Sequence, residues 1–117
     1  MVSLIEIKKR IIQRYKHYRE DYLEYSKIIK KVAKLIFKDD FIKVVVFGST
    51  VVGNYRPDSD IDVAIILRRE SNENKRLEFY KRIKEEIGYF HPFEFHIISE
   101  DEWNSWYKRF IKQYSEV

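Results

Sequence analysis

The sequence predicts an α+β fold, in which a small mixed β-sheet of three or more strands is flanked by about four helices, the first of them long. Three observations predict it. Residues 1–37 contain no glycine or proline and repeat apolar residues at helical spacing. Two apolar, β-branched runs follow, at 41–47 and 60–67. The rest of the chain reads as a helix, a third strand and a last helix.

The composition predicts a single globular domain over residues 1–117. With 44% hydrophobic and 36% charged residues, the chain can bury one core and is too short for two. The absence of cysteine excludes disulfides and thiolate metal sites, and three scattered histidines give no zinc ligand set. No apolar run approaches the roughly 20 residues of a membrane span, so we expect a cytoplasmic protein. Abundant Lys and Glu with a single Met are typical of a thermophile.

The net charge of +4 is concentrated near the N-terminus. Residues 1–40 carry 11 Lys or Arg against 6 Asp or Glu, whereas residues 41–117 carry 12 against 13. A basic segment can bind nucleic acid. Because the positive charges alternate with acidic ones, a solvated helix face is the favoured interpretation, and nucleic acid is not the favoured partner.

Residues 1–37 are expected to form a long amphipathic helix with Ser3 as its N-cap. A continuous helix would be about 50 Å long and would extend beyond a domain of this size, whose radius of gyration is about 13 Å. Two alternatives remain: a break at 19–21, or an overhanging first half that packs on another chain. We favour the overhang, with a homodimer or a protein partner covering Ile7 and Ile11.

Residues 41–98 are expected to contain the chemical site. The run at 41–47 predicts a central strand, which Gly48-Ser49 ends. A helical turn at 50–54, a polar loop and a second strand at 60–67 follow. The remaining elements are a helix over 71–87, with Leu77, Tyr80, Ile83 and Ile87 on one side, and a strand over 93–98. A C-terminal helix is predicted over 99–117, beginning at the capping box of Ser99, with Trp103 and Trp106 in the core.

Asp60 and Asp62 are the first candidates for catalysis. Residues two apart on a strand point to the same face, so the two carboxylates project together. At about 5 Å and an effective dielectric near 20, they repel by roughly 3 kcal/mol. A divalent cation would remove that cost, and oxygen ligands suit Mg²⁺.

A third carboxylate is expected from the strand at 93–98, where Glu94 and His96 share one face. If this strand lies beside the second one, Glu94 joins the two aspartates. Three carboxylates can hold two Mg²⁺ ions, as in-line phosphoryl displacement requires. His96 could assist proton transfer, although a half-buried, hydrogen-bonded histidine is the more common arrangement.

Gly48-Ser49 predicts a phosphate site. A glycine at a strand end lets the backbone approach a ligand, and the amides that follow can bind an anion together with the Ser49 hydroxyl. No Gly-Lys-Ser/Thr follows at the spacing of a P-loop.

These motifs resemble a known family. Gly48-Ser49, then Gly53, then Ser59-Asp60-Ile61-Asp62 is similar to the signature of the DNA polymerase beta nucleotidyltransferase superfamily, in particular its minimal nucleotidyltransferases. The resemblance implies the nucleotidyltransferase fold. It also implies that Gly48, Ser49 and Ser59 bind the nucleotide and that Asp60, Asp62 and Glu94 are catalytic residues and ligands of two Mg²⁺ ions.

The implied reaction transfers a nucleoside monophosphate, AMP from ATP, to a hydroxyl acceptor. The resemblance further implies an all-helical HEPN-type protein partner, for which this chain would be the antitoxin. Two departures concern activity: Val52 stands where many members have a basic residue, and the third carboxylate is Glu94 instead of Asp. The alternative is therefore a non-catalytic module of the same fold that binds a nucleotide or a partner.

Overall fold

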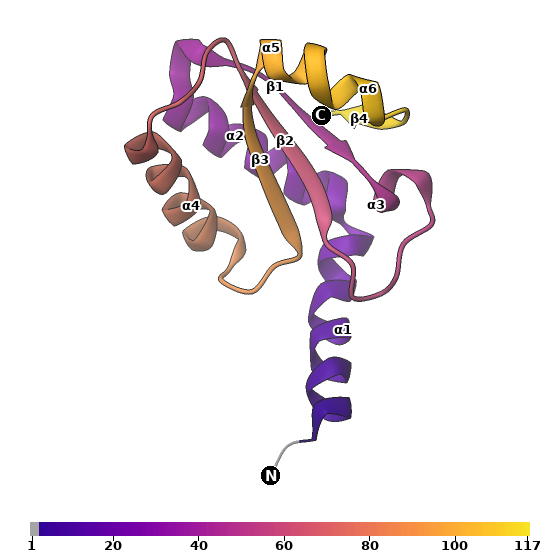
Figure 1. The fold of residues 1–117 in the computed structure, drawn as a ribbon. Coiled ribbons are helices and arrows are strands. Elements are labelled where there is room, and N and C mark those ends of the chain that lie inside the picture. The colour runs from indigo at the N-terminus through magenta and orange to yellow at the C-terminus, as the bar shows by residue number, and fades with distance from the viewer. Residues whose placement is uncertain (1–2) are drawn as a thin grey trace.

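The computed structural model describes residues 3–117 and confirms the predicted α+β fold (Figure 1). The helices are α1 (Leu4–Glu20), α2 (Tyr22–Phe37), α3 (Ser49–Val52), α4 (Glu73–Ile87), α5 (Glu100–Glu102) and α6 (Lys108–Phe110), with a 3₁₀ turn at Lys38–Asp40 and a π-helical turn at Trp103–Tyr107. The strands are β1 (Phe41–Phe47), β2 (Ile61–Leu67), β3 (Phe93–Ser99) and β4 (Tyr114–Glu116).

The four strands form one mixed sheet in the order β3-β2-β1-β4. β1 runs antiparallel to both of its neighbours, and β2 runs parallel to β3. Because β1 and β2 are the inner strands, both of their faces are covered, which explains why they are almost uniformly apolar.

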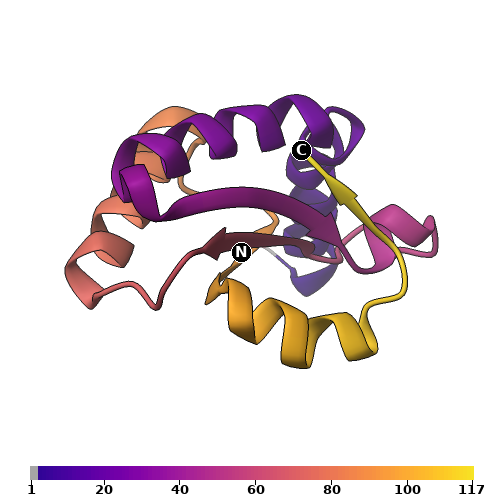
Figure 2. The ribbon, with the colours of Figure 1, turned by 90° about the horizontal axis from the view of Figure 1, so that it is seen from above.

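Helices cover the two faces of the sheet, giving three layers (Figures 1 and 2). α2 and α4 pack on one face, and the C-terminal helical segment packs on the other, where Trp103 is fully buried. The odd-numbered residues of β2 face α2 and α4. The even-numbered Ala64 and Ile66 face the C-terminal segment, so Asp62 belongs to that side of the sheet.

The predicted N-terminal helix is divided into two. Asp21 (φ −109°, ψ 29°) ends α1, with its backbone N–H bonded to the carbonyls of Arg19 and His17, and also precedes the first residue of α2. α1 nevertheless extends past the sheet (Figure 1) and leaves Ile5 69% and Ile7 43% exposed. The break and the overhang, treated as alternatives from the sequence, therefore occur together.

Three details of the prediction are wrong. The buried residues of α4 are Phe79, Ile83 and Ile87, which are four residues apart and therefore lie on one face of the helix. Leu77 lies off this face and is 61% exposed. The last helix ends at Phe110, and the chain turns back to form β4 along the free edge of β1. Trp106 is 58% exposed and lies outside the core that Trp103 fills.

Candidate active site

The turn after β1 brings the backbone against a carboxylate of β2. Gly48 has φ +85°, a left-handed conformation that favours glycine. A Cβ atom at this position would lie 2.5 Å from Asp62 Oδ2, so a larger residue would force the Asp62 carboxylate to move. The positive φ favours glycine here, and the close approach shows that Gly48-Ser49 lies directly beside Asp62.

Asp62 and Glu94 are paired across β2 and β3, as predicted. The two strands run parallel in a register that sets Asp62 beside Glu94 and Ala64 beside His96. All of these side chains belong to the face covered by the C-terminal segment. The expectation that Glu94 lies on the side of the sheet that carries Asp62 is therefore confirmed by the register.

Asp62, Glu94 and His96 form a cluster in which one ligand atom of each residue lies within 4.8 Å of the others. His96 Nε2 lies 3.2 Å from Asp62 Oδ1. Its other ring nitrogen, Nδ1, lies 3.4 Å from the hydroxyl of Tyr107, which comes from the π-helical turn. His96 is half-buried and hydrogen-bonded, as expected, and its position fixes the orientation of Asp62.

The carboxylates of the cluster repel one another, and the pKa of Glu94 shows this repulsion. Loss of water around the Glu94 carboxyl raises its pKa, the negative charge of Asp62 raises it further, and His96 lowers it. Asp60 also raises the pKa of Glu94. A cluster of this kind is stabilised by positive charge placed between its members.

Asp60 is exposed and lies outside the group of three ligand atoms. The negative charge of Asp60 acts on two groups. It raises the pKa of Glu94, by less than desolvation and Asp62 do, and it partly offsets the lowering of the pKa of Arg19 by burial. Asp60 stands immediately before β2, which begins at Ile61, and its charge acts both on the cluster and on α1. Its role as a metal ligand stays a prediction.

The two predicted serines occupy different surroundings. Ser59 closes the turn 56–59: its hydroxyl accepts a hydrogen bond from the backbone N–H of Arg56 at 3.0 Å, and its own N–H donates to the Arg56 carbonyl. Ser49 is half-buried at the start of α3, and its carbonyl accepts from the N–H groups of Gly53 and Asn54. Both serines therefore shape the backbone that surrounds the cluster.

The residues of the cluster fit a divalent cation. The two carboxylates supply the oxygen ligands that Mg²⁺ and Mn²⁺ prefer, and the ligand atoms of the three residues lie within 4.8 Å of one another.

Comparison with known proteins gives the family. Residues 26–115 match the model of the family described as Nucleotidyltransferase domain. The chain belongs to the nucleotidyltransferase domain family. The match contains every predicted site residue, from Gly48 to Glu94, and identifies the cluster as lying in the nucleotidyltransferase domain.

Solved structures agree with the family. This nucleotidyltransferase is 37% identical to a protein whose crystal structure is provisionally assigned as a nucleotidyltransferase, with a TM-score of 0.58, over 79% of this chain and 96% of that chain. It is 18% identical to the spectinomycin adenyltransferase AAD(9) from Enterococcus faecialis, solved with ATP and spectinomycin, with a TM-score of 0.58 over 80% of this chain and 48% of that one. At that identity the likeness concerns the fold alone. A search of curated proteins gave no match.

Two residues beside the cluster have no counterpart among the residues predicted from the sequence. Tyr107 lies within the predicted C-terminal helix, and its hydroxyl contacts His96. Arg19 was seen only as part of a basic helix, yet it is 7% exposed and bonded to the loop before β2. Neither contact has a signal in the sequence, because each depends on how a helix packs against the sheet. Within residues 3–117, none of the helices is both long and apolar enough to cross a membrane.

Proposed function

We propose that this nucleotidyltransferase transfers AMP from ATP to a hydroxyl acceptor with the help of Mg²⁺. The observation that carries the proposal is the meeting of Asp62, Glu94 and His96 beside the Gly48-Ser49 turn. Acids that repel one another, next to a backbone turn that can receive phosphate, suit a metal-bound triphosphate.

In the proposed step the acceptor oxygen attacks the α-phosphorus of ATP, the bond between the α-phosphorus and the bridging oxygen breaks, and pyrophosphate leaves. Asp62 and Glu94, with Asp60 at the edge of the cluster, would hold two Mg²⁺ ions. When bound, the metal stabilises the negative charge that develops on the phosphates. Gly48, Ser49 and Ser59 would line the phosphate side of the site.

Glu94 is the proposed acceptor of the proton from the attacking hydroxyl. In the metal-free protein its pKa is raised by desolvation and by the neighbouring Asp62. His96, bonded to Asp62 and to Tyr107, would keep Asp62 in place while the acceptor enters. Asp62, Glu94 and His96 come from strands of the sheet, which favours precise positioning.

The test uses ATP labelled with ³²P at either the α or the γ position, with MgCl₂ and with a lysate of the source cells as the supply of acceptors. Nucleotidyl transfer predicts that the α label, and not the γ label, becomes attached to an acceptor. Asp62→Asn should reduce transfer at least 100-fold, whereas Asp39→Asn, an exposed acid at the other end of the sheet, should not. Transfer of the γ label instead would reject the proposal.

The second candidate is a module that binds a nucleotide or a protein without catalysis. Val52, which is 56% exposed where many minimal nucleotidyltransferases have a basic residue, favours it. Arg56, the nearby basic residue of the loop, is engaged with Asp58 at 3.5 Å. Nucleotide binding with no transfer of either label would support this candidate.

The proposed partner is a helical protein of the HEPN type, or a second copy of the chain, with this chain as antitoxin in the first case. The support is the part of α1 that extends past the sheet, with apolar side chains such as Ile5 and Ile7 in solvent. Sedimentation of the chain alone tests for a second copy, and sedimentation with the protein encoded by the neighbouring gene tests for the helical partner.

A further inference from the structure

We propose that Arg19 of α1 is a positioning residue of the active site, which holds the loop before β2 against the turn after β1 and so sets the affinity for the nucleotide. The inference rests on the proposed function. Arg19 precedes residues 26–115, the part of the chain covered by the family match, so the match assigns it no role.

Arg19 is the one charged residue among the described residues 3–117 that is buried, with 7% of its surface exposed. Burying a guanidinium is costly unless its donors find acceptors. Burial lowers the pKa of Arg19, while Tyr55, Asp60 and Asp58 act in the opposite direction. Nη1 and Nη2 of Arg19 find acceptors, whereas the buried Nε has no hydrogen-bond partner among the described residues.

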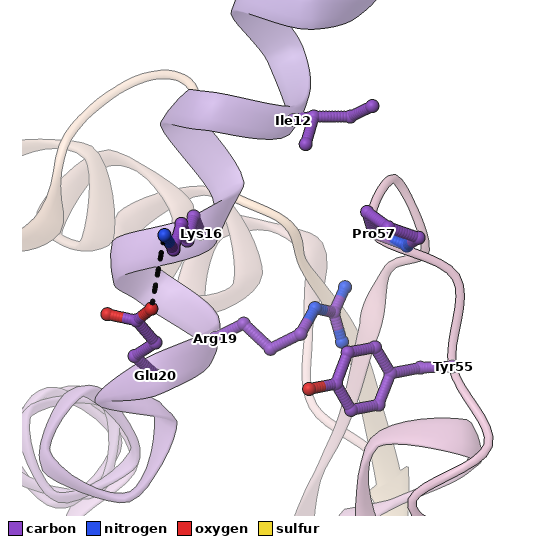
Figure 3. A pocket seen from close by; sticks show the side chains of 6 residues that line it. All are labelled: Ile12, Lys16, Arg19, Glu20, Tyr55 and Pro57. Carbon is purple, nitrogen blue, oxygen red and sulfur yellow. Dashed lines mark ion pairs between the residues drawn. The ribbon is translucent and has the colours of Figure 1, made fainter.

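The side-chain hydrogen bonds and the cation–π contact of Arg19 are made with the segment between β1 and β2. Nη1 donates to the hydroxyl of Thr50 at 2.6 Å, and Nη2 donates to the backbone carbonyl of Ser59. The guanidinium also lies over the ring of Tyr55, 4.4 Å from its centre (Figure 3). One side chain thus binds this segment at three separate points.

These points flank the site. Thr50 follows Ser49 at the start of α3, and Ser59 precedes Asp60. Arg19 therefore ties the proposed phosphate turn to the residue that leads into the acidic strand. Without the Arg19 side chain, Thr50 and Ser59 would no longer be hydrogen-bonded to the same group of α1.

The loop has little other support from α1. A hollow of about 320 Å³ lies between the helix and the loop, bordered by Ile12 and Lys16 on one side and by Tyr55 and Pro57 on the other (Figure 3). The ion pair between Lys8 of α1 and Asp58 of the loop is 3.8 Å long and its lysine is exposed, so it contributes little. The bond network of Arg19 is what joins the two elements.

The test is the substitution Arg19→Lys, which keeps the charge and loses the planar, forked donor group. Its matched control is Arg10→Lys, an exposed position on the same helix. Amide hydrogen exchange is measured by mass spectrometry for residues 49–60 and for β1 and β2. Binding is measured by calorimetry with MgCl₂ and an ATP analogue whose α–β bridging oxygen is replaced by methylene, so that transfer cannot occur.

We expect Arg19→Lys to speed exchange in residues 49–60 by about tenfold and to weaken analogue binding by about tenfold, with the exchange of β1 and β2 unchanged. Arg10→Lys should change neither by more than about twofold. Should Arg19→Lys fail to fold, Thr50→Val, which removes one acceptor and keeps the volume, takes its place with the same expected direction.

Three results would overturn the inference. If the wild-type protein binds the analogue and Arg19→Lys binds it equally well, Arg19 has no role in the site, and the proposed function survives. If exchange rises equally in the loop and in the strands, Arg19 only supports the fold. A wild-type protein that binds no analogue overturns the proposed function and this inference together, and the wild-type titration alone reveals it.

Discussion

At the level of single residues, the cluster is defined by acids that repel one another. Glu94 pairs across the strands with Asp62, and the charge of Asp62 raises its pKa after desolvation. Positions of this kind trade stability for binding, because the charge that weakens the free protein is the charge that attracts a cation.

Glu94→Gln is expected to raise the stability of the metal-free protein slightly, by on the order of 0.5 kcal/mol, because it removes one of the repelling charges and keeps the shape. The same variant should lose most of the thermal stabilisation by MnCl₂. Differential scanning fluorimetry with and without the metal measures both effects. Glu85→Gln, an exposed position on α4, is the control. Equal metal responses in Glu94→Gln and in the wild type would show that Glu94 is not a ligand.

His91 gives a pH dependence away from the cluster. Burial lowers its pKa from the ordinary value of 6.5, and the charge of Lys84 lowers it further. Its Nδ1 accepts a hydrogen bond from the N–H of Phe93 at 3.1 Å, which only the neutral ring can do. The folded state therefore prefers the neutral form, and its contribution is present above pH 6.5 and lost as the pH falls through the lowered pKa.

Urea denaturation at pH 7.5 and pH 5 is expected to show a smaller loss of stability in His91→Gln than in the wild type, since glutamine does not titrate. His17→Gln, whose ring is exposed on α1, serves as the control. If the wild type and His91→Gln lose the same free energy of unfolding between the two pH values, the protonation of His91 is not coupled to folding.

At the level of elements, α4 contains two apolar residues, Phe79 and Leu77, of which only Phe79 packs on the sheet. Phe79 is fully buried and its ring lies 5.8 Å from that of Phe37 and 5.1 Å from that of Phe95. Leu77, two positions earlier, is 61% exposed.

Phe79→Ala is expected to lower the free energy of unfolding by about 3–5 kcal/mol, because it leaves a cavity between α4 and the sheet. Leu77→Ala should change it by less than about 0.5 kcal/mol, as an exposed helical position does. Chemical denaturation of both variants measures the difference. Comparable losses would mean that α4 packs through the other face.

The elements also show where the sequence is informative. Periodicity and β-branched content predicted β1, β2, α4 and β3, and alternation along β3 placed Glu94 on the face of Asp62. β4 could not be predicted, since residues 111–117 continue the apolar spacing of a helix and become a strand only because the edge of β1 is free. The contact of Tyr107 with His96 depends on a π-helical turn that the sequence does not signal.

At the level of the whole molecule, the projection of α1 decides the shape. The principal extents are 48, 31 and 22 Å, and the radius of gyration is 15.0 Å, above the roughly 13 Å of a compact chain of this length. The first half of α1 is exposed, whereas Tyr18 and Arg19 near its end are buried and bonded to the globule. The length of the helix could be predicted from the sequence, but the hydrogen bonds of Tyr18 and Arg19 that hold its end to the globule could not.

Ile7→Glu is expected to leave the free energy of unfolding of the isolated chain within about 0.5 kcal/mol of the wild type, because Ile7 is 43% exposed on the projecting part. Tyr18→Phe should cost about 1 kcal/mol, since the Tyr18 hydroxyl donates to the carbonyl of Ile87 at 2.5 Å. Urea denaturation at low protein concentration measures the free energy of unfolding of both variants and of the wild type. A cost above about 1.5 kcal/mol for Ile7→Glu would place the first half of α1 against the globule or a second copy.

The central claim is that the acidic cluster and the glycine turn form one site for a metal-bound nucleotide. The most direct measurement is a crystal structure grown with MnCl₂ and the methylene analogue of ATP, with manganese located by anomalous scattering. The account predicts a manganese peak in contact with Asp62 and Glu94, and analogue phosphates at the Gly48-Ser49 amides. A bound analogue without manganese at these carboxylates, or one seated away from the turn, would contradict it.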